Sequence, residues 1–166
     1  MLITTSIDFV KPQTYKNFSC GVSELDEYLM RYAKKNHKND IGKTFVYVEN
    51  DLVVGFYTIS MSSILFNDLP ETCKAGVPKY PVPVAQIGRL AVKKSHQGKE
   101  MGSALLVDAF KRIKEASQTV AAYAVIVDAK SERAKKFYKN FGFMEYKGNQ
   151  LCLFLPMKSV NDLLKR

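Results

Sequence analysis

The sequence is poor in the residues that bind metals and form disulfides. Among 166 residues it has two histidines and three cysteines. No Cys-x-x-Cys pair occurs, so a usual set of zinc ligands is missing and we expect no metal. The cysteines are odd in number and far apart, which argues against a disulfide framework and is typical of reduced thiols: Cys20, Cys73 and Cys152.

Long hydrophobic runs are also missing. No stretch approaches the ~20 apolar residues that a membrane-spanning helix needs, so no membrane partner is expected. The first six residues lack the basic and apolar regions of a signal peptide. This lack and the reduced cysteines together predict a cytoplasmic protein. Neither a Gly-x-x-x-x-Gly-Lys-Ser/Thr phosphate loop nor a Gly-x-Ser-x-Gly elbow occurs, so nucleotide hydrolysis and serine hydrolysis are not indicated.

The sequence does have a large apolar fraction and an uneven excess of positive charge. Hydrophobic residues make up 46%, enough for a core, and the length favours one domain over residues 1–166. Residues 1–90 hold 10 basic and 9 acidic side chains, whereas residues 91–166 hold 15 and 7. A basic half-chain suits a polyanionic partner, either nucleic acid or a phosphate-bearing cofactor, although a solvated surface has the same composition.

The first half of the chain predicts a short strand and a loop, then a helix and a hairpin. Ser23 and Asp26 fit a capping box at the start of the helix. The helix would bury one apolar stripe: Leu25, Tyr28, Leu29, Tyr32 and Ala33. Residues 44–48 and 52–59 are rich in β-branched and aromatic side chains and are predicted to be the two strands of the hairpin. The proline-containing residues 62–83 are predicted to be a long loop.

The second half alternates strands and helices. Strands are predicted at residues 84–92, 120–127 and 151–155, and a helix after Gly102. A shorter helix would be capped by Ser131 and ended by Gly142. The resulting order, β, α, β-β, loop, β-α-β-α-β, predicts an α/β or α+β protein with helices packed on a mixed sheet.

Residues 88–104 are the most informative segment, because there a strand leads through a polar, glycine-containing loop into a helix. Such a loop leaves main-chain N–H groups without intrahelical partners where the helix dipole is positive. Phosphate oxygens bind well at such a site, and Lys93, Lys94 and Lys99 add positive charge. The segment therefore indicates a phosphate-bearing ligand, with an ordinary strand-to-helix turn as the alternative.

This segment resembles the acetyl-CoA signature of the GNAT acetyltransferase superfamily, Gln/Arg-x-x-Gly-x-Gly/Ala, with Gln97 first and Gly102 last. The run from Ala134 to Phe143 is similar to the family's A-x-x-F-Y-x-x-x-G-F segment. The resemblance implies the GNAT fold, a mixed and mostly antiparallel sheet flanked by helices. In that fold, two splayed strands hold acetyl-CoA.

A closer resemblance covers nearly the whole chain. Residues 18–29 are similar to the F-x-C-G-x-x-x-L-D-x-x-L opening of one GNAT branch, as are residues 44–46 and the stretch from Pro83 that ends in Gly-Arg-Leu-Ala-Val. That branch contains the acetyltransferase toxins of type II toxin–antitoxin pairs. The resemblance implies acetylation of the free amine of aminoacyl-tRNA, a ribbon-helix-helix antitoxin as partner, and a homodimer.

By this resemblance, acetyl-CoA is the co-substrate. The implied coenzyme-binding residues are Leu90, Ala91, Val92, Gln97, Gly98, Lys99, Glu100, Met101, Gly102 and Ser103. Tyr138 would be the general acid that protonates the departing sulfur, although a tyrosine on an apolar helical stripe is also typical of a core. Candidate tRNA contacts, each equally typical of a solvated surface, are Arg89, Lys34, Lys35, Lys93 and Lys136. Arg89 would contact phosphate or RNA, or pair with a carboxylate.

Glu100 departs from the family pattern, because glycine usually holds the fourth signature position. We expect Glu100 in the first helical turn, where an acid is favoured. An inward-pointing carboxylate would repel phosphate, whereas a side chain turned to solvent would let binding survive, and the hypothesis is that coenzyme binding is weakened rather than abolished. No general base is evident, which mildly favours an α-amine, since its pKa of ~8 lies below the ~10.4 of a lysine side chain. The alternatives are a GNAT enzyme acting on protein lysine or a small amine, and a non-catalytic tRNA-binding protein.

Overall fold

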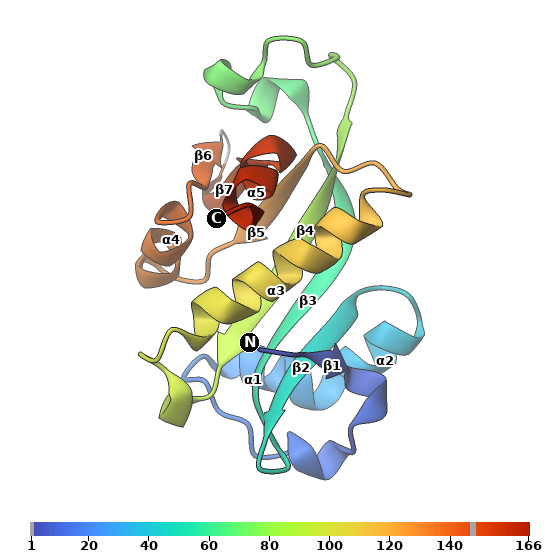
Figure 1. Cartoon of the computed structure of the whole chain (residues 1–166), viewed down its shortest axis with the longest axis vertical. Helices are drawn as coiled ribbons and strands as arrows, with labels where there is room; N and C mark the ends of the chain where they lie inside the picture. Colours follow the sequence, from blue (N-terminus) through green and yellow to red (C-terminus); the bar gives the residue numbers. More distant parts are fainter. Residues whose placement is uncertain (1, 147–148) are drawn as a thin grey trace. The chain divides into compact units, whose positions relative to one another are not determined.

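The computed structural model describes residues 2–146 and 149–166, and the chain divides into two compact units. The N-terminal unit comprises Met1–Ser60 and Gly88–Phe110, and the C-terminal unit comprises Met61–Ile87 and Lys111–Arg166. The strands are hydrogen-bonded in the order β1-β2-β3-β4-β5-β7-β6 (Figure 1). The expected single domain over residues 1–166 remains a prediction.

The N-terminal unit holds the beginning of the sheet and the helices next to it. Its elements are β1 (Thr5–Ser6), α1 (Ser23–Glu27), a π-helical turn (Tyr28–Tyr32), α2 (Ala33–Lys38), β2 (Lys43–Glu49), the first part of β3 (Leu52–Ile64), the end of β4 (Val82–Val92) and the start of α3 (Met101–Ala116). The β2–β3 hairpin turns through Asn50 and Asp51, whose φ angles of 53° and 62° are the left-handed pair that a tight hairpin turn requires.

The first helix differs from its prediction in two ways. Ser23 is the first helical residue, and the cap residue is Val22, without a side-chain cap. The Asp26 carboxylate instead accepts a hydrogen bond from the Cys20 N–H at 2.8 Å. Tyr32 is 49% exposed rather than buried. The reason is the π-helical turn, in which the Ala33 N–H donates to the Tyr28 carbonyl five residues back and rotates Tyr32 off the apolar stripe.

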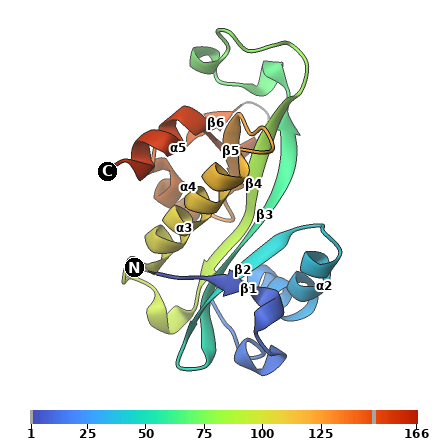
Figure 2. The same ribbon diagram turned by 45° about the vertical axis from the view of Figure 1, so that its right-hand side comes forward.

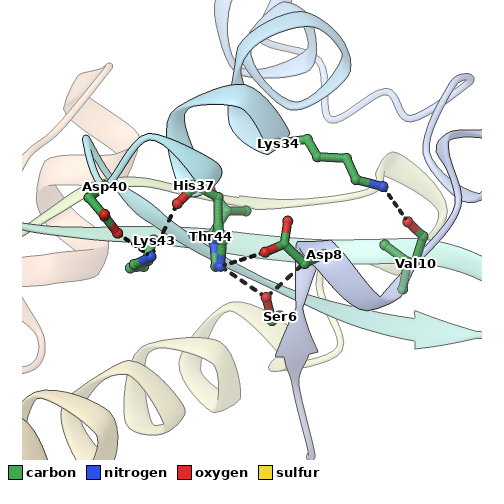
Figure 3. A network of polar contacts seen from close by, with 8 residues as sticks. All are labelled: Ser6, Asp8, Val10, Lys34, His37, Asp40, Lys43 and Thr44. Atoms are coloured by element: carbon green, nitrogen blue, oxygen red, sulfur yellow. Dashed lines mark hydrogen bonds and ion pairs between the residues drawn. The ribbon is translucent and has the colours of Figure 1, made fainter.

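His37 fastens the end of α2 to the sheet edge (Figure 3). Its Nδ1 accepts the Thr44 N–H at 2.9 Å, so the ring proton lies on Nε2, which is 3.0 Å from the Ser6 Oγ. Nε2 is also 3.6 Å from an Asp8 oxygen. Because Nδ1 is occupied as an acceptor, the ring is the neutral tautomer, and its hydrogen bonds join α2 to β1 and β2. Figure 2 shows α2 beside β2.

The C-terminal unit holds the rest of the sheet and two helices. Its elements are the ends of β3 and α3, the start of β4, two short 3₁₀ turns (Phe66–Asp68 and Glu71–Cys73), β5 (Ala124–Asp128), α4 (Glu132–Lys139), β6 (Met144–Tyr146), β7 (Asn149–Pro156) and α5 (Met157–Leu164). β4 and β5 are parallel, and β7 pairs antiparallel with both β5 and β6. The buried side chains of this unit include Val84, Ile126 and Phe154.

The predicted class is confirmed: the protein is mixed α/β, with a mostly antiparallel sheet. Several boundaries were wrong. β5 begins at Ala124 rather than residue 120, where Val120 is 56% exposed, and β3 and β4 extend into the predicted loop over residues 62–83. The sequence prediction also missed β6 and α5. Ser131 does cap α4, because its hydroxyl accepts the Ala134 N–H at 3.1 Å.

In the parts of the chain that the structure describes, no helix is both long and apolar enough to cross a membrane.

Candidate active site

The loop between β4 and α3 is fixed by hydrogen bonds to two other segments of the N-terminal unit. The Lys93 N–H donates to the Val54 carbonyl at 2.8 Å, and the Lys94 N–H to the Ser19 carbonyl at 2.9 Å. The Gln97 side-chain amide donates to the carbonyls of Cys20, at 2.7 Å, and Val92, at 2.8 Å. The loop therefore reaches α3 along a defined path.

The loop enters α3 through two residues in the left-handed region. Gly98 has φ of 78° and Glu100 has φ of 62°. A Cβ added to Gly98 would meet no atom within 4 Å, so the main chain there is open to a ligand. The first helical hydrogen bond runs from the Ala104 N–H to the Glu100 carbonyl, at 3.1 Å. The N–H groups of Met101, Gly102 and Ser103 precede that bond, in the position where helix N-termini bind phosphate.

The sequence predicted Glu100 in the first turn of α3, but the residue lies just before the helix. Its φ of 62° is not helical, so the difference is one of conformation and not of boundary assignment. The residue is exposed, and so an inward-facing carboxylate in this loop is not observed. A left-handed main chain at this position also gives a physical reason why glycine suits it.

The Phe18–Leu29 motif supports this loop, because its Ser19 and Cys20 carbonyls accept the loop's hydrogen bonds. The sequence did not reveal this role. Phe18 is buried edge-on against Phe56, with ring centroids 5.6 Å apart. Cys20 is 8% exposed, and burial raises the pKa of its thiol to about 11, which suits packing and not a nucleophile. At Gly21, φ is 96°, and an added Cβ would lie 3.3 Å from the Lys94 Cε.

The end of β4 carries three of the expected coenzyme-binding residues. Ala91 is buried at 5% exposure, while Leu90 and Val92 are half-buried. Arg89, beside them, lies over the Tyr28 ring with its guanidinium carbon 3.6 Å from the ring centroid. Among the described residues its observed partner is thus an aromatic face, whereas the sequence left a carboxylate as one alternative.

The basic residues proposed to contact tRNA differ in how free they are. The Lys34 ammonium donates to the Val10 carbonyl at 3.1 Å, within the N-terminal unit (Figure 3). Lys35 and Lys136 are exposed, and Lys93 is half-buried. Lys34 is therefore the least suited of the four lysines to a contact with a polyanion.

Tyr138 lies on α4 in the C-terminal unit and is 6% exposed. Its ring packs edge-on against Phe137 and Phe143, with centroids 5.2 Å and 5.5 Å away. Burial, and secondarily the charge of Asp128, raise the pKa of the phenol above its usual value. The hydroxyl consequently keeps its proton over the physiological pH range.

A polar cluster in the same unit was not predicted from the sequence. Asp128, at the end of β5, accepts hydrogen bonds from the Cys152 thiol at 2.8 Å and from the Gln86 amide at 3.2 Å. The Tyr146 hydroxyl interacts with the same thiol. Sequence patterns could not reveal this cluster, because it depends on the pairing of β5 with β7, which sets Asp128 opposite Cys152.

Within residues 2–146 and 149–166, no three histidine, cysteine, aspartate or glutamate side chains come together in a group that could hold a metal ion.

The fold and the loop are those of an acetyltransferase. Residues 40–145 match the family "Acetyltransferase (GNAT) domain", which is more than half of the chain. The chain therefore belongs to the GNAT family, whose members are acetyltransferases that use acetyl-CoA. Within this family it is 36% identical to the "tRNA-acetylating toxin" of Mycobacterium tuberculosis, over 89% of each chain.

Two solved structures extend this similarity to the fold. AtaT complexed with acetyl-methionyl-tRNAfMet has a TM-score of 0.87 and 29% identity, covering 98% of this chain and 99% of that one. An AtaT variant bound to acetyl-CoA and to the C-terminus of its antitoxin AtaR has a TM-score of 0.83 and 27% identity, over 99% of each chain. The related toxins are thus found with a tRNA, with acetyl-CoA and with an antitoxin.

Proposed function

We propose that this enzyme transfers the acetyl group of acetyl-CoA to the α-amine of aminoacyl-tRNA. The observation that carries the proposal is the full-length similarity to the tRNA-acetylating toxin, at 36% identity over 89% of both chains. The AtaT complex with an acetylated aminoacyl-tRNA supports the same substrate class. Acetylation of the amine would block translation.

The residues of the β4–α3 loop fit the phosphates of acetyl-CoA. Main-chain N–H groups from Gly98 to Ser103 would bind the pyrophosphate at the start of α3, and Lys99 would add positive charge. The main chain of Leu90, Ala91 and Val92 would hold the pantetheine arm. Acetyl-CoA supplies the activated acetyl group. Gln97 keeps its proposed place in this site, and its side-chain amide also holds the loop in position through the carbonyls of Cys20 and Val92.

Tyr138 is the proposed general acid. Its buried phenol, with a raised pKa, is fully protonated at neutral pH and can donate its proton to the sulfur as the carbon–sulfur bond breaks. Packing between Phe137 and Phe143 fixes the direction of the ring and so of the O–H bond. The nitrogen loses one proton and the sulfur gains one, so no net proton is consumed when a neutral amine reacts.

The basic surface would provide the tRNA contacts. Arg89, Lys35, Lys93 and Lys136 retain this proposed role, whereas the Lys34 ammonium is already used within the protein. The stacked Arg89 guanidinium still presents N–H donors along its edge to a phosphate. The proposal further includes a ribbon-helix-helix antitoxin, a homodimer and a cytoplasmic location, where charged tRNA is found.

The test uses radiolabelled acetyl-CoA and a pool of charged tRNA, with deacylated tRNA as the matched control. Label is expected on the charged pool alone. Tyr138→Phe, which keeps the ring packing, should lower the rate by ~100-fold or more, the usual share of a general acid. Equal labelling of deacylated tRNA, or none at all on the charged pool, would contradict the proposed substrate.

A further inference from the structure

The Asp128 cluster lies where the parallel strands β4 and β5 stop pairing. The last pair of the β4–β5 register joins Ile87 to Val127, and Asp128 is the next residue of β5. β4 continues beyond this point to Val92, through the residues proposed to hold the coenzyme. The Asp128 carboxylate thus lies at the C-terminal end of β5, one residue beyond the last residue that pairs with β4.

Asp128 is held by neutral donors. The Gln86 amide comes from β4, and the Cys152 thiol comes from β7, so neighbouring strands on each side of β5 orient the two carboxylate oxygens. Neither donor carries a positive charge that would neutralise the carboxylate. An ionised carboxylate can accept about four hydrogen bonds, so these two leave room for a further donor.

The groups around the cluster also bear on its chemistry. Tyr138 is close enough for the Asp128 charge to raise the pKa of its phenol. The charge of Asp68 raises the pKa of the Tyr146 phenol, and the charge of Lys130 lowers that of the Cys152 thiol, against the larger effect of burial in both. A half-buried carboxylate therefore lies in the same unit as the proposed general acid, within the range at which its charge acts on the phenol.

An α-amine reacts faster at neutral pH when such a group is beside it, although it needs a base less than a lysine side chain does. With a pKa of ~8, most of it is an ammonium at pH 7, and an ammonium cannot attack a thioester. A carboxylate attracts the cation, orients it through N–H···O bonds, and accepts the proton that must leave before attack. The sequence offered no general base for this step.

Resting on the proposed function, we infer that Asp128 binds the α-ammonium group of the acceptor and takes up its proton. The proton balance is simple. One N–H proton of the ammonium passes to the Asp128 carboxylate and then to water. The neutral nitrogen then forms its bond to the acetyl carbon as the carbon–sulfur bond breaks, and the nitrogen loses a second proton to water. The sulfur takes its proton from Tyr138, which regains one from water, so one proton in total is released for each ammonium that reacts.

The test compares Asp128→Asn with the wild-type protein in acetyl transfer at several pH values. The isosteric amide keeps the size of the side chain but has neither charge nor basicity. As a matched control, Asp162→Asn removes one exposed carboxylate of α5, in the same unit. Acetyl-CoA affinity and the melting temperature report whether the variant is folded and its coenzyme site intact, and both should match the wild type.

The expected result is a loss that depends on pH. At about pH 6.5, kcat/KM of Asp128→Asn should be at least ~30-fold below wild type, and at about pH 8.5, where the amine is already neutral, only a few-fold below. Asp162→Asn should follow the wild-type profile. A deficit that is constant across pH, or no deficit, would overturn the role of Asp128.

Two acceptors keep this inference separate from the tRNA proposal. The assay is run with the charged tRNA pool and with a pool of amino-acid amides, which carry the same α-amine without RNA. If only the amides are acetylated, the tRNA substrate is wrong and the Asp128 comparison proceeds on the amides. Failure of the folded wild type to acetylate either acceptor would overturn both.

Discussion

Replacing Glu100 with glycine is expected to raise both the stability of the protein and its affinity for acetyl-CoA. The φ of 62° at Glu100 is a left-handed conformation. For a residue with a Cβ this costs ~1–2 kcal/mol, whereas glycine adopts it freely. Glycine in turn loses ~0.5–1 kcal/mol to its greater freedom in the unfolded chain. The net expected gain is about 0.5–1 kcal/mol, a rise in melting temperature of about 1–4 °C for a chain of this size.

The charge acts on affinity and not on the fold. Glu100 is exposed, so its carboxylate would act on a bound phosphate through water. Two unit charges about 7 Å apart in water repel by ~0.6 kcal/mol, before salt screening reduces this further. Two pyrophosphate charges together give an expected two- to fivefold tighter dissociation constant for acetyl-CoA when the carboxylate is removed.

A second variant separates the two effects. Glu100→Gln removes the charge and keeps the Cβ, so it should match the affinity gain of Glu100→Gly without the gain in melting temperature. Calorimetric titration with acetyl-CoA and thermal unfolding measure the two quantities. An unchanged melting temperature in Glu100→Gly would refute the backbone argument, and an unchanged dissociation constant in both variants would refute the electrostatic one.

Two further predictions concern the supports of the site. Gln97→Ala removes hydrogen bonds to Cys20 and Val92, so we expect the free energy of unfolding to fall by ~1–3 kcal/mol. KM for acetyl-CoA should rise while KM for the acceptor stays constant. Steady-state kinetics with both substrates measure this, and an equal rise in both KM values would contradict the expected role of Gln97. Burial, and also Lys43, lower the pKa of His37, against the opposing charges of Asp8 and Asp40. The unfolded chain therefore takes up the proton first as pH falls below about 6.5, and stability should decline by up to ~1.4 kcal/mol per pH unit until the folded-state pKa is reached. Urea midpoints at pH 7.5 and 5.5 measure this decline. His37→Asn, whose amide oxygen can accept the Thr44 N–H in place of Nδ1, should reduce it.

Local patterns were enough to predict the elements whose determinants are local. Ser131 caps α4 with a hydroxyl three residues from the N–H that it accepts, and the strands of the β2–β3 hairpin are close in sequence. Ser23 has the same kind of pattern and fails, because the acid that completes it, Asp26, bonds to Cys20 instead. α5 was missed because it follows Pro156 without a side-chain cap, so nothing local announces its start.

The site was predictable only as far as its motifs are contiguous. The signature from Gln97 to Gly102 indicated a phosphate loop, and the loop does precede a helix N-terminus. Pairing of distant strands decides the rest. The β5–β7 register places Cys152 opposite Asp128, and the Arg89 guanidinium stacks on the ring of Tyr28, which is far away in the sequence. Neither contact follows from spacing or composition.

The two motifs of the N-terminal unit are one structural feature. Cys20 and Gln97 are far apart in the chain, yet the Gln97 amide donates to the Cys20 carbonyl, and the Cys20 N–H donates to Asp26. The peptide groups of Cys20 thus link α1 to the coenzyme loop. A change at Asp26 should therefore reach acetyl-CoA binding without any contact with the coenzyme.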